Sequence, residues 1–131
     1  LWLLRIEATV VYGGSGLSKL LDADWFGGTV TWGRVVRVQD RIPDWAVGTL
    51  TDRTFHTGAA KVIVLTELFL AVGLWLPRTR RLAIVVAVCF HVAIQLTANV
   101  ETFSLLCLSA LVIWRTPAHR PAPLPQVEQL H

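Results

Sequence analysis

Lys19, Glu67 and His91 carry side chains that can accept or donate protons. Each of them lies within a stretch of mostly apolar residues, where an ionisable side chain is unusual. A charged side chain at the centre of a membrane costs roughly 2.5–3.5 kcal/mol on insertion scales, so it usually faces a partner or a cavity. An acid in such a position is by default a candidate functional group. If this protein performs chemistry, these three side chains are the candidates for it.

Lys19 ends a regular series of polar and small residues near the start of the chain. Spacings of four, three, four and three residues place the members of this series on one face of a helix: Arg5, Thr9, Tyr12, Gly16 and Lys19. Gly16 and the two glycines before it would let a second backbone or a flat ligand approach closely. One interpretation is a helix-packing interface from which Lys19 reaches the lipid headgroups, and this is the more frequent case. The other is the wall of a ligand pocket.

Glu67 lies nearer the middle than the ends of an apolar stretch, residues 59–76. It could be a structural carboxyl, either protonated or paired with an arginine such as Arg5. It could also handle protons or orient a ligand. The sequence gives these two interpretations equal weight.

His91, Gln95 and Asn99 are four residues apart and form a polar stripe on an otherwise aliphatic helix. Such spacing favours hydrogen bonds from His91 and Gln95 to a neighbouring helix. A single histidine with no second ligand one turn away does not make a metal site. We therefore expect no metal in this protein.

Four stretches of sequence are apolar enough to form the helices of a membrane bundle. About 17–25 apolar residues are needed to cross a hydrocarbon core of about 30 Å. Residues 59–76 and 82–98 meet this length, 102–114 is short, and 1–21 is interrupted by charges and glycines. A further stretch, 25–39, mixes tryptophan, valine and arginine and is predicted to lie at the interface or to re-enter the membrane. We expect an all-α, multi-pass transmembrane bundle of about four helices.

Basic residues predict the orientation of this bundle. Three arginines in 78–81 join two of the spans, and Arg115 and Arg120 follow the last span. Two crossings place both clusters on one side, which the positive-inside rule assigns to the cytoplasm. Four arginines in the segment 22–58 oppose this assignment, because they would lie outside. The protein is predicted to sit in the cell membrane with a cytoplasmic C-terminus.

The composition agrees with a membrane protein. The chain has 131 residues, of which 53% are hydrophobic, and its mean hydropathy is +0.54. A formal net charge of +3 is too weak to indicate nucleic-acid binding. Residues 1–115 are expected to form one transmembrane domain, and the Pro-rich residues 116–131 a disordered cytoplasmic tail. Because the sequence contains no methionine, we expect a fragment or a processed chain.

A longer motif surrounds Lys19. The segments Gly16-Leu17-Ser18-Lys19-Leu20 and Asp24-Trp25-Phe26-Gly27-Gly28 resemble the Gly-Leu-x-Lys-Leu…Asp-Trp-x-x-Gly stretch of the HTTM family, the membrane domain shared with vitamin K-dependent gamma-glutamyl carboxylase. Later features of the family are matched in the same order by Glu67-Leu68-Phe69, Phe90-His91 and Phe103-Ser104. The resemblance covers residues 5–115.

The resemblance implies a partial HTTM-like domain, namely the C-terminal half of a helical membrane bundle. By resemblance, Lys19 is the base that deprotonates vitamin K hydroquinone, Glu67 is an orienting acid, and His91 lies near the same pocket. The resemblance also implies residues that contact a quinone cofactor of the vitamin K type: Gly16, Trp25 and Gln95.

Departures from the family leave the activity open. The chain has Ser18-Lys19 where the carboxylase has two lysines, and residues 116–131 are not expected to form its large peptide-binding domain. One interpretation is a membrane protein that binds a quinone or another lipophilic small molecule and uses Lys19 as a base. The alternative is a non-enzymatic membrane protein whose polar stripes are helix-packing contacts. The expected partner in both cases is the lipid membrane, and no protein partner is identified.

Overall fold

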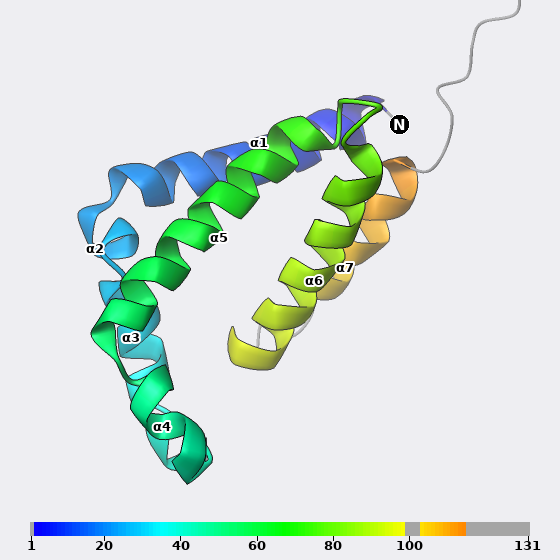
Figure 1. The fold of residues 1–131 in the computed structure, drawn as a ribbon. Coiled ribbons are helices and arrows are strands. Elements are labelled where there is room, and N and C mark those ends of the chain that lie inside the picture. The colour runs from blue at the N-terminus through cyan, green and yellow to red at the C-terminus, as the bar shows by residue number, and fades with distance from the viewer. Residues whose placement is uncertain (1, 99–102, 115–131) are drawn as a thin grey trace, which may run out of the picture.

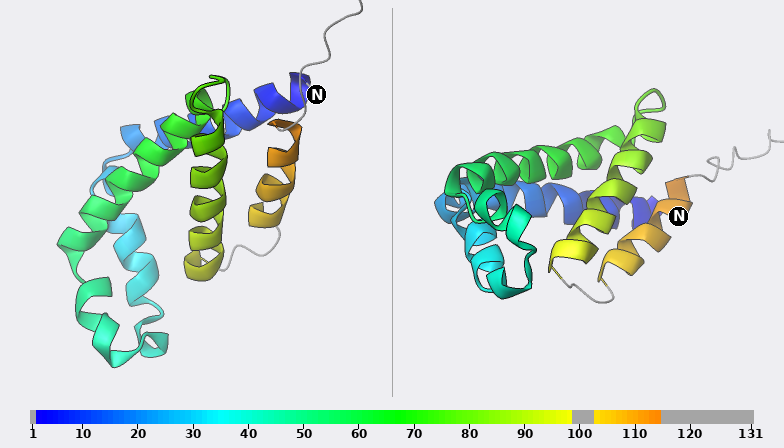
Figure 2. Two further views of the ribbon diagram at one scale, coloured as in Figure 1. Left: turned by 45° about the vertical axis from the view of Figure 1, so that its right-hand side comes forward. Right: turned by 60° about the horizontal axis from the view of Figure 1, so that its bottom comes forward.

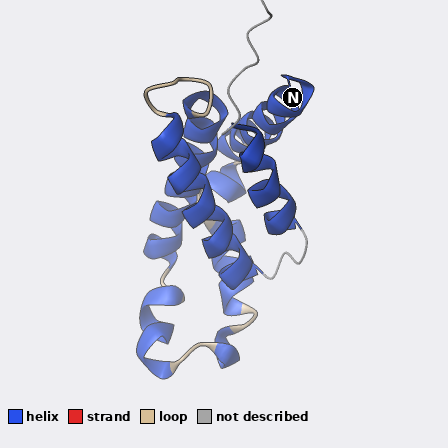
Figure 3. Cartoon of the chain, turned by 90° about the vertical axis from the view of Figure 1, so that its right-hand side faces the viewer, coloured by secondary structure: helices blue, strands red, loops and turns tan. Residues whose placement is uncertain are grey.

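The fold is described by a computed structural model for residues 2–98 and 103–114, and in this part of the chain every regular element is a helix (Figure 3). This confirms the all-α prediction for the described residues. The elements in chain order are α1 (Trp2–Leu21), α2 (Ala23–Phe26), α3 (Thr29–Val36), the 3₁₀ turn η1 (Gln39–Arg41), α4 (Asp44–Leu50), α5 (Arg53–Gly73), α6 (Arg80–Ala98), α7 (Phe103–Ala110) and the 3₁₀ turn η2 (Leu111–Trp114).

The longer helices form an arch with two arms (Figure 1). The long arm consists of α1 and α5, which run in opposite directions and pack side by side. The short arm consists of α6, α7 and η2, and it leaves the end of α5 at a steep angle (Figure 2). Helices α3 and α4 lie at the opposite end of α5. The inside of the arch is therefore bordered by α1, α3, α5 and α6.

Aspartate caps set the starts of two helices, α2 and α5, at the end of the long arm away from α6 (Figure 1). The carboxylate of Asp22 accepts hydrogen bonds from the backbone N–H groups of Asp24 and Trp25, at 2.9 and 3.1 Å. The carboxylate of Asp52 accepts one from Phe55 N at 2.7 Å, so α5 begins earlier than the predicted stretch 59–76. Such caps satisfy N–H groups that the first turn of a helix leaves without a partner.

Gly28 allows α3 to turn back against α5. Its φ is +79°, and a Cβ at this position would lie 2.6 Å from the backbone of His56. Any larger residue would therefore clash as well as adopt an unfavourable backbone conformation. This close approach brings α2 and α3 to the start of α5.

The buried core lies where the two arms meet. Ala83 and Ala87 of α6 are fully buried, and a Cβ on Gly73 of α5 would lie 3.3 Å from Ala83. Small side chains let helices pack closely, which is common in membrane bundles. The apolar residues of this core are Tyr12, Leu70, Ala71, Leu74, Ala83, Ala87, Leu111 and Trp114.

The predicted membrane spans correspond to helices with adjusted boundaries. Residues 82–98 lie within α6, and 102–114 divides into α7 and η2. The predicted interfacial segment 25–39 is not one element, because it includes the end of α2, all of α3 and the start of η1. The link 99–101, Arg115, Arg120 and the predicted tail 116–131 lie outside the described residues.

Large apolar side chains cover the outer faces of the arch. Leu3 and Leu21 of α1 are 80% and 77% exposed, and Leu65 of α5 is 66% exposed. Among the helices described, α5 alone is both long and apolar enough to cross a membrane. The multi-pass arrangement and the cytoplasmic C-terminus therefore stay predictions.

Candidate functional site

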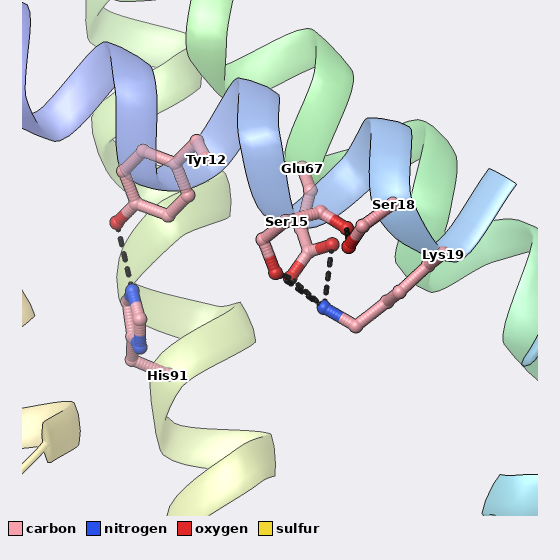
Figure 4. Close-up of polar contacts among 6 residues, drawn as sticks. All are labelled: Tyr12, Ser15, Ser18, Lys19, Glu67 and His91. Atoms are coloured by element: carbon pink, nitrogen blue, oxygen red, sulfur yellow. Dashed lines mark hydrogen bonds and ion pairs between the residues drawn. The ribbon is translucent and has the colours of Figure 1, made fainter. Parts of the chain in front are cut away.

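An ion pair links the two helices of the long arm (Figure 4). Lys19 Nζ lies 2.7 Å from Glu67 Oε1 and 2.8 Å from Oε2, and it also donates a hydrogen bond to Ser15 Oγ. The Ser15 hydroxyl in turn donates to Glu67 Oε1 at 3.1 Å. The two charged side chains are 15% and 7% exposed. The site thus holds an ammonium, a hydroxyl and a carboxylate in mutual contact and largely shielded from solvent.

Local sequence explains why these three groups meet. Ser15 and Lys19 are four residues apart and share one face of α1. A Cβ on Gly16 would lie 3.1 Å from Leu68 and 3.2 Å from Glu67 Cβ. The glycine therefore lets α1 approach α5 closely enough for the lysine to contact the carboxylate.

A second polar pair joins α1 to α6. Tyr12 Oη and His91 Nε2 are 2.7 Å apart, and both side chains are buried (Figure 4). Tyr12 lies seven residues before Lys19, or about two helical turns, so both pairs project from the same side of α1. This hydrogen bond between helices agrees with the role that the sequence favoured for His91.

Trp25 of α2 contacts the cations of this region. Lys19 Nζ lies 5.1 Å from the centroid of the Trp25 ring, and the guanidinium carbon of Arg34 lies 5.3 Å from it. A cation within about 6 Å of an aromatic ring is attracted by the ring's electron density. The indole therefore connects the ion pair on α1 to Arg34 on α3.

These groups surround a cavity of about 580 Å³ inside the arch. Its size falls within the range of about 300–1,000 Å³ that is usual for small-molecule sites. Apolar side chains dominate its walls. The lining residues are Val11, Tyr12, Ser15, Lys19, Trp25, Thr31, Arg34, Val35, Leu50, Phe55, His56, Ala59, Ile63, Glu67, Phe90, His91, Ala93 and Ile94.

A second cavity of about 500 Å³ lies between α1 and the α7–η2 segment. Tyr12 and Val11 line this cavity as well as the first. The phenol ring of Tyr12 therefore stands between the two spaces.

The structure brings four of the predicted site residues to the first cavity: Lys19, Glu67, His91 and Trp25. Gly16 instead lies at the α1–α5 contact. Gln95 does not line the cavity, and its buried Oε1 has no hydrogen-bond partner within the described residues. Asn99, the last member of the predicted stripe, lies outside them.

The partner suggested by sequence for Glu67 was wrong. Arg5 donates a hydrogen bond to the carbonyl of Ile113 at 2.9 Å, and its guanidinium lies 5.0 Å from the Trp114 ring centroid. Arg5 therefore holds η2 against α1. Lys19 takes the place proposed for this arginine, and its ammonium contacts the carboxylate of Glu67.

Sequence reasoning missed several polar residues of the cavity wall, among them Ser15, Arg34 and His56. Ser15 could have been found, because it lies one turn before Lys19 on the same helix face. Arg34 and His56 come from a short helix and a helix start, which carry no long periodic pattern. Within the described ranges, no group of three or more His, Cys, Asp or Glu side chains is placed to hold a metal ion.

Comparison with known proteins identifies the family. The HTTM domain matches residues 1–118. The chain is 24% identical over 122 residues to the sporulation-delaying protein SdpB of Bacillus subtilis (strain 168), covering 90% of this chain but 38% of SdpB. No solved structure matches the chain. HTTM domains are typically membrane-associated, and this chain belongs to the HTTM domain family.

Proposed function

We propose that this chain is part of a multi-pass protein of the cell membrane whose larger cavity binds a quinone or another flat, lipophilic molecule. The observation that carries the proposal is an apolar cavity of about 580 Å³ into which two buried polar pairs project from one side of α1. Most ligand sites combine apolar walls with a few fixed polar groups in this way.

The apolar walls suit the body of such a ligand, and the polar pairs suit its oxygens. Phe90 and Ile94 of α6 and Ile63 of α5 provide aromatic and aliphatic surface. The ammonium of Lys19 can donate a hydrogen bond to a carbonyl oxygen. Ligand orientation would follow from which polar pair the oxygen contacts.

Base chemistry at this site would involve the ion pair as a unit. Lys19 is held as an ammonium while Glu67 is a carboxylate, so the lysine alone is not a free base in this arrangement. The pair can accept one proton from a ligand hydroxyl and then consists of the ammonium beside a neutral carboxyl. The lysine can take that proton itself if it passes its own to the carboxylate 2.7 Å away.

A quinone-binding measurement tests this function. We expect a short-chain ubiquinone analogue to quench the protein's tryptophan fluorescence saturably in neutral-lipid nanodiscs, because Trp25 lines the cavity. Lys19→Ala should weaken binding about tenfold, which is typical for the loss of a charged hydrogen-bond donor. Lys61→Ala, which removes an exposed lysine outside the cavity, is the matched control.

Folding must be separated from binding in this experiment. The double variant Lys19→Met/Glu67→Leu removes the ion pair without leaving an isolated charge, so it is expected to fold even if Lys19→Ala does not. Helical circular dichroism reports whether each variant folds. Unchanged quinone affinity in both folded variants would overturn the proposal.

A second candidate function is a non-enzymatic membrane protein in which the polar pairs serve helix packing. The supporting observation is that each pair joins two helices: Tyr12–His91 joins α1 to α6, and Lys19–Glu67 joins α1 to α5. If Lys19→Ala and His91→Ala lower the melting temperature in detergent but leave the quinone response unchanged, packing is the better explanation.

A further inference from the structure

Arg34 of α3 lies at the exposed edge of the larger cavity. Its guanidinium carbon is 5.3 Å from the Trp25 ring centroid, and both residues line the cavity. The Arg34 side chain is also exposed to the surroundings. A cation therefore stands where an apolar cavity opens.

The charges around the cavity do not balance. Among the described residues that line the cavity, Glu67 is the one acid, and its carboxylate is already engaged by Lys19. Arg34 makes no ion pair with any acid in the described part of the chain. The positive charge of Arg34 therefore has no anionic partner from the described part of the chain, and a bound ligand could supply one.

We infer that the natural ligand carries a carboxylate or a phosphate that pairs with Arg34, while its apolar body lies inside the cavity against α6. The inference rests on the proposed function, because it names the chemical class of the cavity's ligand. A guanidinium suits this role, since its planar fork can donate two parallel hydrogen bonds to a carboxylate or phosphate. The ligand class is an anionic amphiphile.

The position of Arg34 distinguishes it from a similar arginine nearby. Arg53 lies 5.4 Å from the Trp32 ring centroid and donates a hydrogen bond to Thr29 Oγ1 at 3.1 Å. Arg53 therefore has the same kind of aromatic contact, but it does not line the cavity. If contact with a tryptophan ring were enough, substitution of either arginine would weaken the binding of an anionic ligand equally. Our inference instead predicts that only substitution of Arg34 weakens it.

Matched pairs of charged and neutral amphiphiles test the inference. The probes are dibrominated stearic acid, the corresponding alcohol and a brominated lysophosphatidic acid, each measured by tryptophan quenching in nanodiscs of zwitterionic lipid. We expect the wild type to bind an anionic probe about tenfold more tightly than the alcohol, as for one charge-assisted hydrogen bond. Arg34→Gln should remove this preference while the alcohol still binds, and Arg53→Gln should keep it.

Chain length separates cavity binding from attraction to a charged surface. For saturated acids that compete with the bromo-acid, each added methylene should strengthen binding about fourfold until the cavity is full. Ala59→Trp, which fills the cavity, should abolish this dependence, whereas Val62→Trp on the exposed face of α5 should not. Tighter binding of stearic acid identifies a carboxylate ligand, and tighter binding of the lysolipid identifies a phosphate ligand.

The outcomes distinguish this inference from the proposed function. Equal binding of acid, phosphate and alcohol, or an anion preference that survives Arg34→Gln, overturns the anionic ligand but leaves a lipophilic site. Anion binding without chain-length dependence also overturns it, because a surface cation then explains the result. If the quinone and all the amphiphiles fail to bind, both the anionic ligand and the proposed function are overturned.

Discussion

At the scale of single residues, the ammonium of Lys19 contacts both carboxylate oxygens of Glu67 where little water reaches either group. Two charges removed from water are stable only while each compensates the other. Loss of one partner leaves a buried charge without compensation, whereas loss of both leaves an apolar contact. Single and double substitutions at this pair should therefore differ in their effects on stability.

We expect Glu67→Leu to lower the free energy of unfolding by up to about 3–5 kcal/mol, because it leaves the ammonium of Lys19 without its partner. The double variant Lys19→Met/Glu67→Leu should recover most of that loss. Thermal unfolding in one detergent, followed by helical circular dichroism, measures both. A double variant as unstable as Glu67→Leu would show that the carboxylate stabilises the fold by contacts other than the lysine.

At the scale of elements, the contact between α1 and α5 determines whether the site exists. Gly16 allows the close approach of the two helices, and Lys19 lies less than one turn further along α1. A side chain at position 16 would push the helices apart at the place where the ion pair forms. Packing and chemistry therefore depend on the same few residues.

Gly16→Leu should destabilise the protein by about 1–3 kcal/mol, the usual range for overpacking a close contact. Its Cβ alone would lie 3.1–3.2 Å from Leu68 and Glu67. Gly14→Leu is the matched control, since a Cβ at Gly14 has no neighbour within 4 Å. The control should be neutral or more stable, because leucine favours a helix more than glycine does. Equal melting temperatures for the two variants would contradict the importance of this contact.

The long helices were largely predictable from the sequence, because long apolar runs and the spacing along 1–21 depend on local chemistry alone, whereas α2, α3 and α4 were not predicted as separate helices. The buried face of α1 is the predicted one, with Arg5, Tyr12 and Gly16 buried. The partner of Glu67 was not predictable in this way. It depends on how α1 and α5 are rotated and shifted against each other, and this follows from contacts between residues distant in sequence.

At the scale of the whole molecule, the arch holds two buried polar pairs inside and exposes many large apolar side chains. Leu106 of α7 is 66% exposed, as is Leu65 of α5. Exposed apolar surface of this extent marks contact with lipid or with another protein. The composition and the family agree with lipid as the surrounding medium.

We expect the protein to remain in the membrane pellet after washing with alkaline carbonate and to enter solution only with detergent. The physical reason is that burial of apolar surface contributes about 25 cal/mol per Å² removed from water. Fractionation followed by immunoblotting measures the distribution, with a known peripheral protein as the control. Release by carbonate alone would contradict an integral membrane location.

Helix α1 contacts several other segments along its length. Arg5 holds η2, Tyr12 meets α6, Gly16 admits α5, and Lys19 contacts both α5 and the ring of Trp25 on α2. Helices α1 and α5 therefore each contact several other helices as well as each other. A substitution at one of the inward positions of α1 is therefore expected to disturb the packing of more than one helix, whereas an apolar substitution at Leu3, which is 80% exposed, should leave these contacts in place.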